Sequence, residues 1–113
     1  MAVTEPIDEW LTADFGYGVQ ARLLHREQTP FQLLEVWESP SFGRMLRLDG
    51  ALQCSENDEY FYHEPMVHLA ALAHERPRRA LVFGGGDGGS AEELLKHPDL
   101  TAVTLVEVDQ QVV

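Results

Sequence analysis

The residues best suited to chemistry lie in a glycine-rich stretch, GGGDGG, at positions 84–89. Gly84, Gly86 and Gly89 fit the pattern G-x-G-x-x-G between a predicted strand and a predicted helix, which is the setting in which this pattern binds nucleotides. Glycine permits positive φ and close approach of a ligand, and a helix start adds unpaired N–H groups. A tight turn without a ligand is the alternative, but its five glycines would be costly in chain entropy. The stretch therefore predicts a nucleotide-type ligand.

Asp87, inside this turn, indicates the charge of that ligand. A dinucleotide would place its pyrophosphate against the turn, where a carboxylate repels it, whereas a cationic ligand end would be stabilised. The alternative is that Asp87 turns outward and caps the following helix. A phosphate-binding P-loop is excluded because Ser90 stands where that motif requires lysine. Together these residues favour an adenosine ligand with a positively charged tail.

Glu107 ends the next predicted strand, about 20 residues beyond the glycine turn. An acid at this point binds the ribose hydroxyls of NAD-type and adenosyl-sulfonium ligands alike. A solvent-exposed strand end is the alternative interpretation. Glu107 and the glycines support a nucleotide site together, but they do not choose the cofactor.

The run YHEPMVH contains two histidines that do not fit a zinc motif. The protease motif H-E-x-x-H has its histidines four residues apart on one helix face, whereas His63 and His68 are five apart and point away from each other. We expect His68 and His74 to lie on the helix surface or to cap the helix. Tyr62 and His63 precede Pro65 near the helix start. Two roles are equally open for them: they line a pocket, or they have a purely structural role.

Composition limits the classes of partner. The 113 residues include 19 acidic and 8 basic ones, a formal net charge of -11, which argues against binding of nucleic acid and is compatible with cationic ligands or simply with solubility. Cys54 is the single cysteine, which excludes an intrachain disulfide and a multi-thiolate metal site. The sequence has neither a signal-peptide pattern at its N-terminus nor an apolar run of about 18 residues, so we expect a cytoplasmic protein without a membrane span.

Two parts are expected along the chain. Residues 1–57 predict a small antiparallel β-domain with strands at 17–24, 31–37 and 45–48, and Asp49-Gly50 predicts a hairpin turn into 51–54. Residues 58–113 predict an α/β domain, with a helical segment over 58–76, a strand at 79–83, a helix at 90–97 and a strand at 102–107. This βαβ unit predicts parallel strands with a right-handed connection.

Details of the helical segment are also predicted. Asp58 is expected to cap an initial turn, and Pro65 to open the longer helix at a first-turn position. Four apolar residues share one face of this helix at spacings of three and four: Met66, Leu69, Ala70 and Ala73.

At the other end of the chain, a further helix is expected to begin near Val113, and two parallel strands are few for an open sheet. We therefore expect this chain to be the front part of a larger protein.

Three segments of the chain resemble spermidine synthases, the polyamine aminopropyltransferases: LDGALQCSENDEYFYHEPMVHL, RALVFGGGDGGSAEELLKHP and VTLVEVDQQVV. The resemblance runs from about residue 8 to residue 113. It implies an N-terminal β-domain used for oligomer contacts, in a homodimer or homotetramer, followed by a Rossmann-like domain of the methyltransferase type. It also implies transfer of an aminopropyl group from decarboxylated S-adenosylmethionine to putrescine, giving spermidine and methylthioadenosine, with that donor as co-substrate and neither a further cofactor nor a metal.

The resemblance assigns roles by position. It implies that the thioadenosine part of the donor contacts Gln32, Glu107, Gly84, Gly85 and Gly86. It implies that the amine chain and the putrescine pocket involve Tyr62, His63 and Asp87, with Gln53 a weaker candidate. The family's catalytic base is an aspartate in a later loop, so no catalytic base is expected before Val113. Two other hypotheses stay open: a methyltransferase that uses intact S-adenosylmethionine, and a non-catalytic oligomerisation module.

Overall fold

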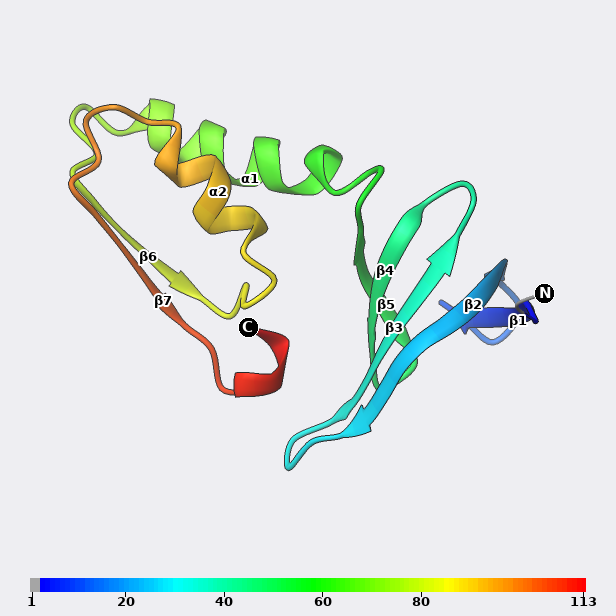
Figure 1. Ribbon diagram of the computed structural model, residues 1–113. Coiled ribbons are helices and arrows are strands. Elements are labelled where there is room, and N and C mark those ends of the chain that lie inside the picture. The colour runs from blue at the N-terminus through cyan, green and yellow to red at the C-terminus, as the bar shows by residue number, and fades with distance from the viewer. Residues whose placement is uncertain (1–2) are drawn as a thin grey trace. The chain divides into compact units, whose positions relative to one another are not determined.

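The computed structural model describes residues 3–113, which belong to two compact units, Met1–Asp58 and Glu59–Val113 (Figure 1). The first unit is an antiparallel sheet, and the second combines two helices with a short parallel sheet. The α/β fold class predicted from the sequence is confirmed by these two sheets.

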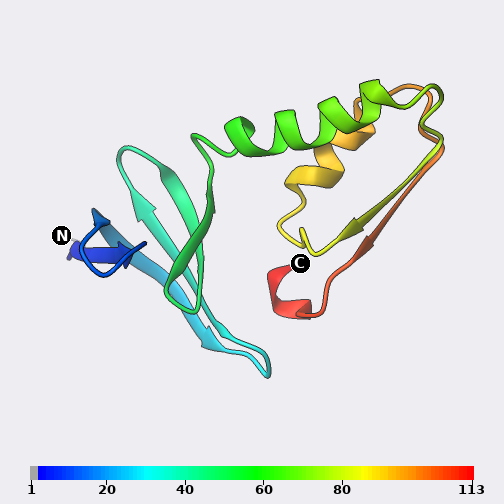
Figure 2. The same cartoon turned by 180° about the vertical axis from the view of Figure 1, so that it is seen from behind.

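In the part of the first unit that the structure describes, five strands lie in chain order, each antiparallel to the next (Figure 2). They are β1 (Glu5–Trp10), β2 (Gly16–Gln28), β3 (Leu33–Ser39), β4 (Gly43–Leu48) and β5 (Ala51–Ser55). The strand β1 was not predicted, and β2 extends four residues beyond its predicted end, from residue 24 to Gln28. The turn before β5 is as predicted: Asp49 and Gly50 have φ of 48° and 82°, and Leu48 pairs with Ala51. Two successive positive φ values are typical of a type I′ hairpin turn.

The first unit packs around a small apolar cluster. Ile7, Ala21, Trp37 and Met45 are buried, and they come from four different strands. Val19, Leu23 and Leu52 pack against this cluster while staying half-buried. Because side chains on a strand alternate between the two faces, this cluster fixes which face of each strand is turned inward.

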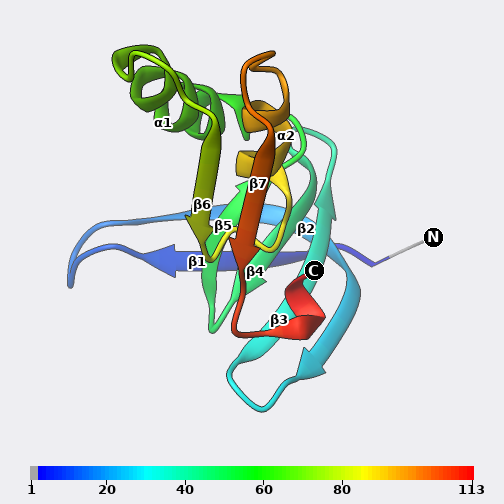
Figure 3. The same ribbon diagram turned by 90° about the vertical axis from the view of Figure 1, so that its left-hand side faces the viewer.

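The second unit contains α1 (Tyr60–Ala73), β6 (Arg79–Phe83), α2 (Gly89–Leu95), β7 (Ala102–Val106) and a short 3-10 helix, η1 (Gln110–Val112). The strands β6 and β7 run in the same direction, with Arg79 opposite Ala102 and Phe83 opposite Val106 (Figure 3). The predicted parallel strand pair is therefore confirmed. The helix α2 ends at Leu95, two residues before the predicted end, and η1 lies where a further helix was expected to begin.

The start of α1 differs from the prediction. The carbonyl of Glu59 accepts hydrogen bonds from the N–H groups of Tyr62 and His63, at 3.0 and 2.9 Å, so the first turn closes before Pro65. Pro65 therefore lies inside the helix rather than opening it. Glu59 occupies the N-cap position, and Asp58 instead accepts a hydrogen bond from the Ser55 hydroxyl.

The buried face of α1 also differs from the prediction. Its buried residues are His63 and Val67, whereas Met66 and Leu69, on the predicted apolar face, are 44% and 72% exposed. The physical reason is that α2 contacts the face of α1 that carries His63, where Gly89 leaves room for the imidazole ring. The buried face is thus chosen by a polar residue, which hydrophobic periodicity does not detect.

Candidate functional site

The glycine turn between β6 and α2 has a backbone that other residues would adopt only with strain. Gly84, Gly85 and Gly88 have φ of 74°, 69° and 86°. This left-handed region is costly for residues with a Cβ atom. The Gly84 N–H donates to the Val106 carbonyl at 2.8 Å, which ties the turn to the end of β7.

Two other glycines of the turn leave room for functional side chains. A Cβ atom added at Gly86 would lie 2.7 Å from Cγ of Glu107, and one added at Gly89 would overlap the His63 ring, 2.6 Å from Nε2. Real Cβ contacts are not this short. Gly86 and Gly89 are therefore needed to make room for the Glu107 and His63 side chains.

Glu107 lies directly after β7 and is held against the glycine turn. Its Oε2 accepts the Gly86 N–H at 3.1 Å, and its Oε1 accepts the Asp109 N–H at 3.1 Å. The side chain is half-buried, which contradicts the alternative interpretation as a solvent-exposed strand end. The carboxylate is fixed in orientation at the mouth of the turn.

Asp87 contacts both the start of α2 and the His63 ring. Its Oδ1 accepts the Gly89 N–H at 3.3 Å, which supports the first turn of α2. Its Oδ2 lies 3.7 Å from Nε2 of His63, and its side chain is 22% exposed. The second carboxylate oxygen thus faces an inward-pointing histidine rather than open solvent.

His63 is buried, with only 4% of its surface exposed. Its Nδ1 is hydrogen-bonded to Oε2 of Glu59, the N-cap residue of α1, four residues earlier in the chain. Tyr62, at 62% exposure, places its ring edge-on to the imidazole with the centroids 5.2 Å apart. The ring of His63 therefore has a carboxylate at each nitrogen, Glu59 and Asp87. Glu59 belongs to the motif DEYFYHE of the family resemblance, where its acidity was expected to serve the helix start, and its contact with His63 was not predicted. The signal that could have found it is the i, i+4 spacing between the two residues.

His68 does not lie on the helix surface as expected. Its Nε2 is hydrogen-bonded to Glu93 at 2.7 Å and its Nδ1 to Nε2 of His97 at 2.8 Å, so it joins α1 to α2 and the turn after it. The Lys96 ammonium, and then His68, lower the pKa of the Glu93 carboxyl. His74 behaves as predicted, because it is the C-cap residue of α1 and its Nδ1 accepts the Arg76 N–H at 3.0 Å.

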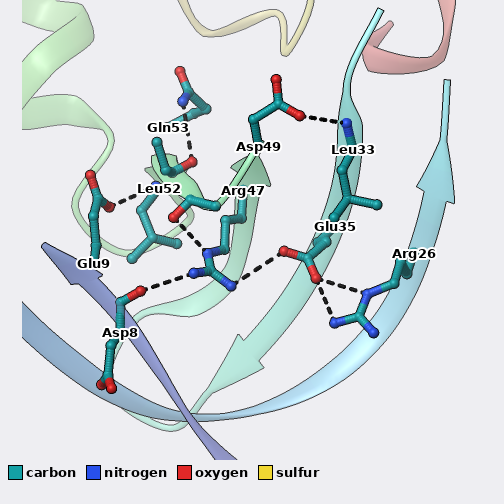
Figure 4. Close-up of polar contacts among 11 residues, drawn as sticks. Asp8, Glu9, Arg26, Leu33, Glu35, Arg47, Asp49, Leu52 and Gln53 are labelled. Carbon is teal, nitrogen blue, oxygen red and sulfur yellow. Dashed lines mark hydrogen bonds and ion pairs between the residues drawn. The ribbon is translucent and has the colours of Figure 1, made fainter. Parts of the chain in front are cut away.

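The remaining candidates lie in the first unit. Gln32 belongs to the turn between β2 and β3, where its N–H donates to Oγ1 of Thr29 at 3.0 Å and its carbonyl accepts the Thr29 N–H at 2.9 Å. Gln53, on β5, donates to the Ala51 carbonyl at 3.2 Å (Figure 4). Gln53 also lines a cavity of about 270 Å³ whose walls include Tyr17, Phe42, Met45, Leu52 and Cys54. The roles of Gln32 and Gln53 stay predictions from the sequence.

Among residues 3–113, no helix is both long and apolar enough to cross a membrane. Within the same range, no group of three or more His, Cys, Asp or Glu side chains is arranged to hold a metal ion.

Both units match known domain families. Residues 12–56 match the spermidine synthase tetramerisation domain, and residues 59–113 match the spermine/spermidine synthase domain. Together these two matches cover most of the chain, and they adjoin at the boundary between the two units.

Curated relatives carry the name polyamine aminopropyltransferase. The protein from Nitrosomonas europaea is 49% identical over 106 residues, which is 93% of this chain and 33% of the relative. The protein from Moorella thermoacetica is 47% identical over 106 residues, which is 93% of this chain and 38% of the relative. The chain therefore spans 33% to 38% of the length of these relatives.

Solved structures of spermidine synthase have the same fold. The enzyme from Thermotoga maritima superposes with a TM-score of 0.92 at 34% identity, covering 96% of this chain and 39% of that one. A spermidine synthase in complex with the transition-state analogue AdoDATO gives the same TM-score and identity, with 38% of that chain covered.

Proposed function

The chain belongs to the spermidine synthase family, and on this premise we propose that the full-length protein is an aminopropyltransferase of polyamine biosynthesis. Its donor would be decarboxylated S-adenosylmethionine and its acceptor putrescine, and its products spermidine and methylthioadenosine. The observation that carries the proposal is the convergence of Asp87, His63 and Glu107 on one glycine turn in the second unit. Asp87 and His63 suit the cationic end of that donor, and Glu107 suits its ribose.

The charges at the turn fit the donor's cationic end. We propose that Asp87, with His63 beside it, receives the aminopropyl ammonium, because a partly buried carboxylate stabilises a cation and repels an anion. Intact S-adenosylmethionine would bring its own carboxylate to this place and be repelled, which makes Asp87 a determinant of donor choice. Tyr62, exposed beside His63, would wall the acceptor pocket.

The other end of the donor fits Glu107 and the turn backbone. We propose that the Glu107 carboxylate accepts hydrogen bonds from the ribose hydroxyls, while Gly84, Gly85 and Gly86 let the thioadenosine approach the main chain. Support comes from the fixed orientation of Glu107, which two backbone N–H groups hold at 3.1 Å each. Gln32 would add a contact to the same moiety, as the sequence resemblance implies.

The reaction is a direct displacement. The neutral amine of putrescine attacks the methylene carbon bonded to the sulfonium, a C–N bond forms, and the C–S bond breaks with its electron pair returning to sulfur as a neutral thioether. The attacking nitrogen becomes a substituted ammonium and loses one proton to a base. The residues described here position and select the donor, and none of them is assigned as that base.

The proposal is tested by methylthioadenosine release. The full-length protein is incubated with decarboxylated S-adenosylmethionine and putrescine, and wild type is compared with Asp87→Asn. Loss of a charge-assisted contact predicts that kcat/KM for the donor falls by about 10- to 100-fold in the variant. Asp99→Asn, which removes an exposed carboxylate elsewhere in the second unit, is the matched control and should be unaffected. Undiminished turnover in Asp87→Asn would refute the role given to Asp87.

Calorimetry with both donors separates this function from that of a methyltransferase. We expect decarboxylated S-adenosylmethionine to bind at least about tenfold more tightly than the intact form, since the carboxylate of the latter meets Asp87. Tighter binding of the carboxylated donor would favour the methyltransferase hypothesis.

We also propose that the first unit joins copies of the protein into a homodimer or homotetramer. The matched domain family is described as a tetramerisation domain, and the β1–β2 hairpin exposes large apolar side chains at its tip, Trp10, Leu11 and Phe15, at 69%, 55% and 61%. Exposed apolar patches are typical of association surfaces. Sedimentation of Trp10→Ser/Phe15→Ser should show a smaller assembly than wild type, and an unchanged assembly would contradict this use of the hairpin.

We further propose that the reaction takes place in the cytoplasm. We also propose that it needs no metal or added cofactor, because the displacement uses only the substrates' own nucleophile and leaving group. Dialysis of the full-length protein against a chelator should leave turnover unchanged. Activity that disappears on chelation and returns with one added metal would contradict the proposal.

A further inference from the structure

We propose that Glu59 is a positioning residue that sets the tautomer of His63 and so prepares it to accept a hydrogen bond from the donor's ammonium group. The proposal rests on the proposed function, which supplies the ammonium. Its physical basis is the arrangement of Glu59, His63 and Asp87, all within the second unit.

The two nitrogens of the His63 ring are not equivalent. Nδ1 is within hydrogen-bond distance of Oε2 of Glu59, whereas Nε2 is 3.7 Å from Oδ2 of Asp87, beyond the range of a normal hydrogen bond. A neutral imidazole carries a single ring proton, and the hydrogen bond made by one nitrogen determines which of them holds it. The proton therefore belongs on Nδ1, where it is donated to Glu59.

This tautomer gives Nε2 the character of an acceptor. Its lone pair and the Asp87 carboxylate then lie 3.7 Å apart, and both accept hydrogen bonds. A primary ammonium has three N–H donors and can donate one to each of them, so the pair forms a receptor for a protonated amine. With the proton on Nε2 instead, the ring would direct an N–H at the ammonium, and two donors would face each other.

The ring has little freedom to escape this constraint. His63 is buried, and Gly89 lies so close to it that an added Cβ atom would overlap the ring. Glu59 and His63 are one helical turn apart at the start of α1, so the two groups are positioned by the same element. Glu59 remains 32% exposed in its side chain, which leaves it close to solvent but on the far side of the ring from Asp87.

The first measurement is the tautomer itself. Ring nitrogens of histidine are observed by NMR in full-length protein labelled with nitrogen-15 in histidine only, at a pH where the ring is neutral, and His63→Gln assigns the signal. We expect Nδ1–H in the wild type and a shift toward Nε2–H in Glu59→Ala. Glu59→Gln keeps an oxygen acceptor for Nδ1–H and should restore the wild-type tautomer.

The second measurement is donor affinity, with decarboxylated S-adenosylmethionine as the probe in calorimetry. Glu59→Ala should weaken binding about tenfold, the equivalent of one lost hydrogen bond, and Glu59→Gln should recover most of the affinity. The matched control is Glu75→Gln, which removes an exposed carboxylate just past the other end of α1 and should change neither reading.

The outcomes separate clearly. An Nε2–H ring in the wild type, an unchanged tautomer or affinity in folded Glu59→Ala, or a folded Glu59→Gln as defective as Glu59→Ala would each overturn the proposal. If the wild type does not bind the donor at all, the proposed function fails, yet the NMR comparison of free proteins still tests whether Glu59 holds the Nδ1 proton.

Discussion

Buried or half-buried carboxylates occur in both units, and Glu35 in the first differs from Glu107 in the second in the partners that surround it. In the first unit, Glu35 is almost fully buried at 2% exposure and lies opposite Arg26 on β2 and opposite Arg47 on β4 (Figure 4). Its oxygens are 2.6 Å from the Arg26 guanidinium and 3.3 Å from that of Arg47. In the second unit, Glu107 is met by the backbone N–H groups of Gly86 and Asp109 instead.

This difference indicates which carboxylate supports the fold and which is suited to a ligand. Two guanidinium groups neutralise Glu35 and tie three neighbouring strands together, so its charge is used within the protein. Backbone N–H groups orient Glu107 but carry no formal charge, and under the proposed function its negative charge acts on the ligand. The kind of donor around an acidic residue is thus a more useful guide to its role than its burial.

The largest expected effect tests the structural half of this comparison. Glu35→Gln leaves Arg47, whose side chain is 17% exposed, without its ion pair, and removing one partner of a buried pair is strongly destabilising. We expect a loss of about 3 kcal/mol in the free energy of unfolding, at the lower end because Arg26 is half-exposed. Urea denaturation followed by the fluorescence of Trp37, which Arg26 overlies at 5.9 Å, measures it.

An exposed pair in the same sheet is the control for Glu35. Glu38 bonds Arg22 at 2.5 Å with both side chains more than 40% exposed, so Glu38→Gln should cost less than about 1 kcal/mol. Equal losses in the two variants would show that the buried network has no special structural role.

The second prediction concerns the space that the glycine turn provides. Gly89→Ala forces a Cβ atom into the His63 ring, so the ring must move away from Asp87. We expect donor affinity to fall about 30-fold, measured by calorimetry in the full-length protein. Gly88→Ala has free space around its Cβ but keeps a φ of 86°, so it should cost about 1 kcal/mol of stability with little change in affinity. Similar affinity losses in both variants would attribute the effect to backbone strain instead.

The third prediction tests the ligand half of the comparison. Glu107→Gln removes the charge while preserving the shape, and it turns one acceptor atom into a donor that faces a backbone N–H. We expect about tenfold weaker donor binding and a stability change of about 1 kcal/mol or less, the reverse of the pattern in Glu35→Gln. A variant that unfolds like Glu35→Gln but binds normally would place Glu107 among the structural carboxylates.

Sequence reasoning succeeded where local pattern determines structure. The strand β6 lies at Arg79–Phe83 as predicted, and β7 begins at Ala102 as predicted, because short apolar runs bounded by turn signals specify such strands locally. It failed at β1, whose sequence EPIDEW carries three acids and contributes only Ile7 to the core. Its strand conformation comes from pairing with β2, which is a tertiary effect.

The candidate site was predicted in the same uneven way. The glycine turn, Asp87 and Glu107 could be found from a motif with fixed spacing, and the structure brings them together with His63. The contact of Glu59 with His63 was missed despite their i, i+4 spacing, because the longer helix was expected to open at Pro65. The contacts of Arg26 and Arg47 with Glu35 could not be found without the strand register. Both depend on boundaries that propensities alone leave uncertain by a few residues.

The smallest expected effect is a pH dependence in the first unit. The Tyr17 hydroxyl donates to Oε2 of Glu9 at 2.6 Å, and burial, followed by this hydrogen bond, raises the pKa of Tyr17 to about 12. The same bond, together with the Leu52 N–H, lowers the pKa of Glu9. These shifts make the contact between a protonated tyrosine and an ionised glutamate favourable in the folded state.

The sign of the pH dependence follows from these directions. Because the pKa of Tyr17 is higher in the folded than in the unfolded chain, its contribution is complete below about pH 10 and is lost as the pH rises toward about 12. The contribution of Glu9, whose pKa is lowered, is present above the ordinary pKa of a glutamate, 4.5, and is lost as the pH falls below it. Urea midpoints of Tyr17→Phe should therefore fall less than those of wild type between pH 10 and 12, by a small amount since Tyr17 is partly exposed. Tyr60→Phe, in the second unit, is the control, and its urea midpoint should decline between pH 10 and 12 as much as that of wild type. A Tyr17→Phe profile parallel to that of wild type would show that the contact between Tyr17 and Glu9 does not contribute to stability.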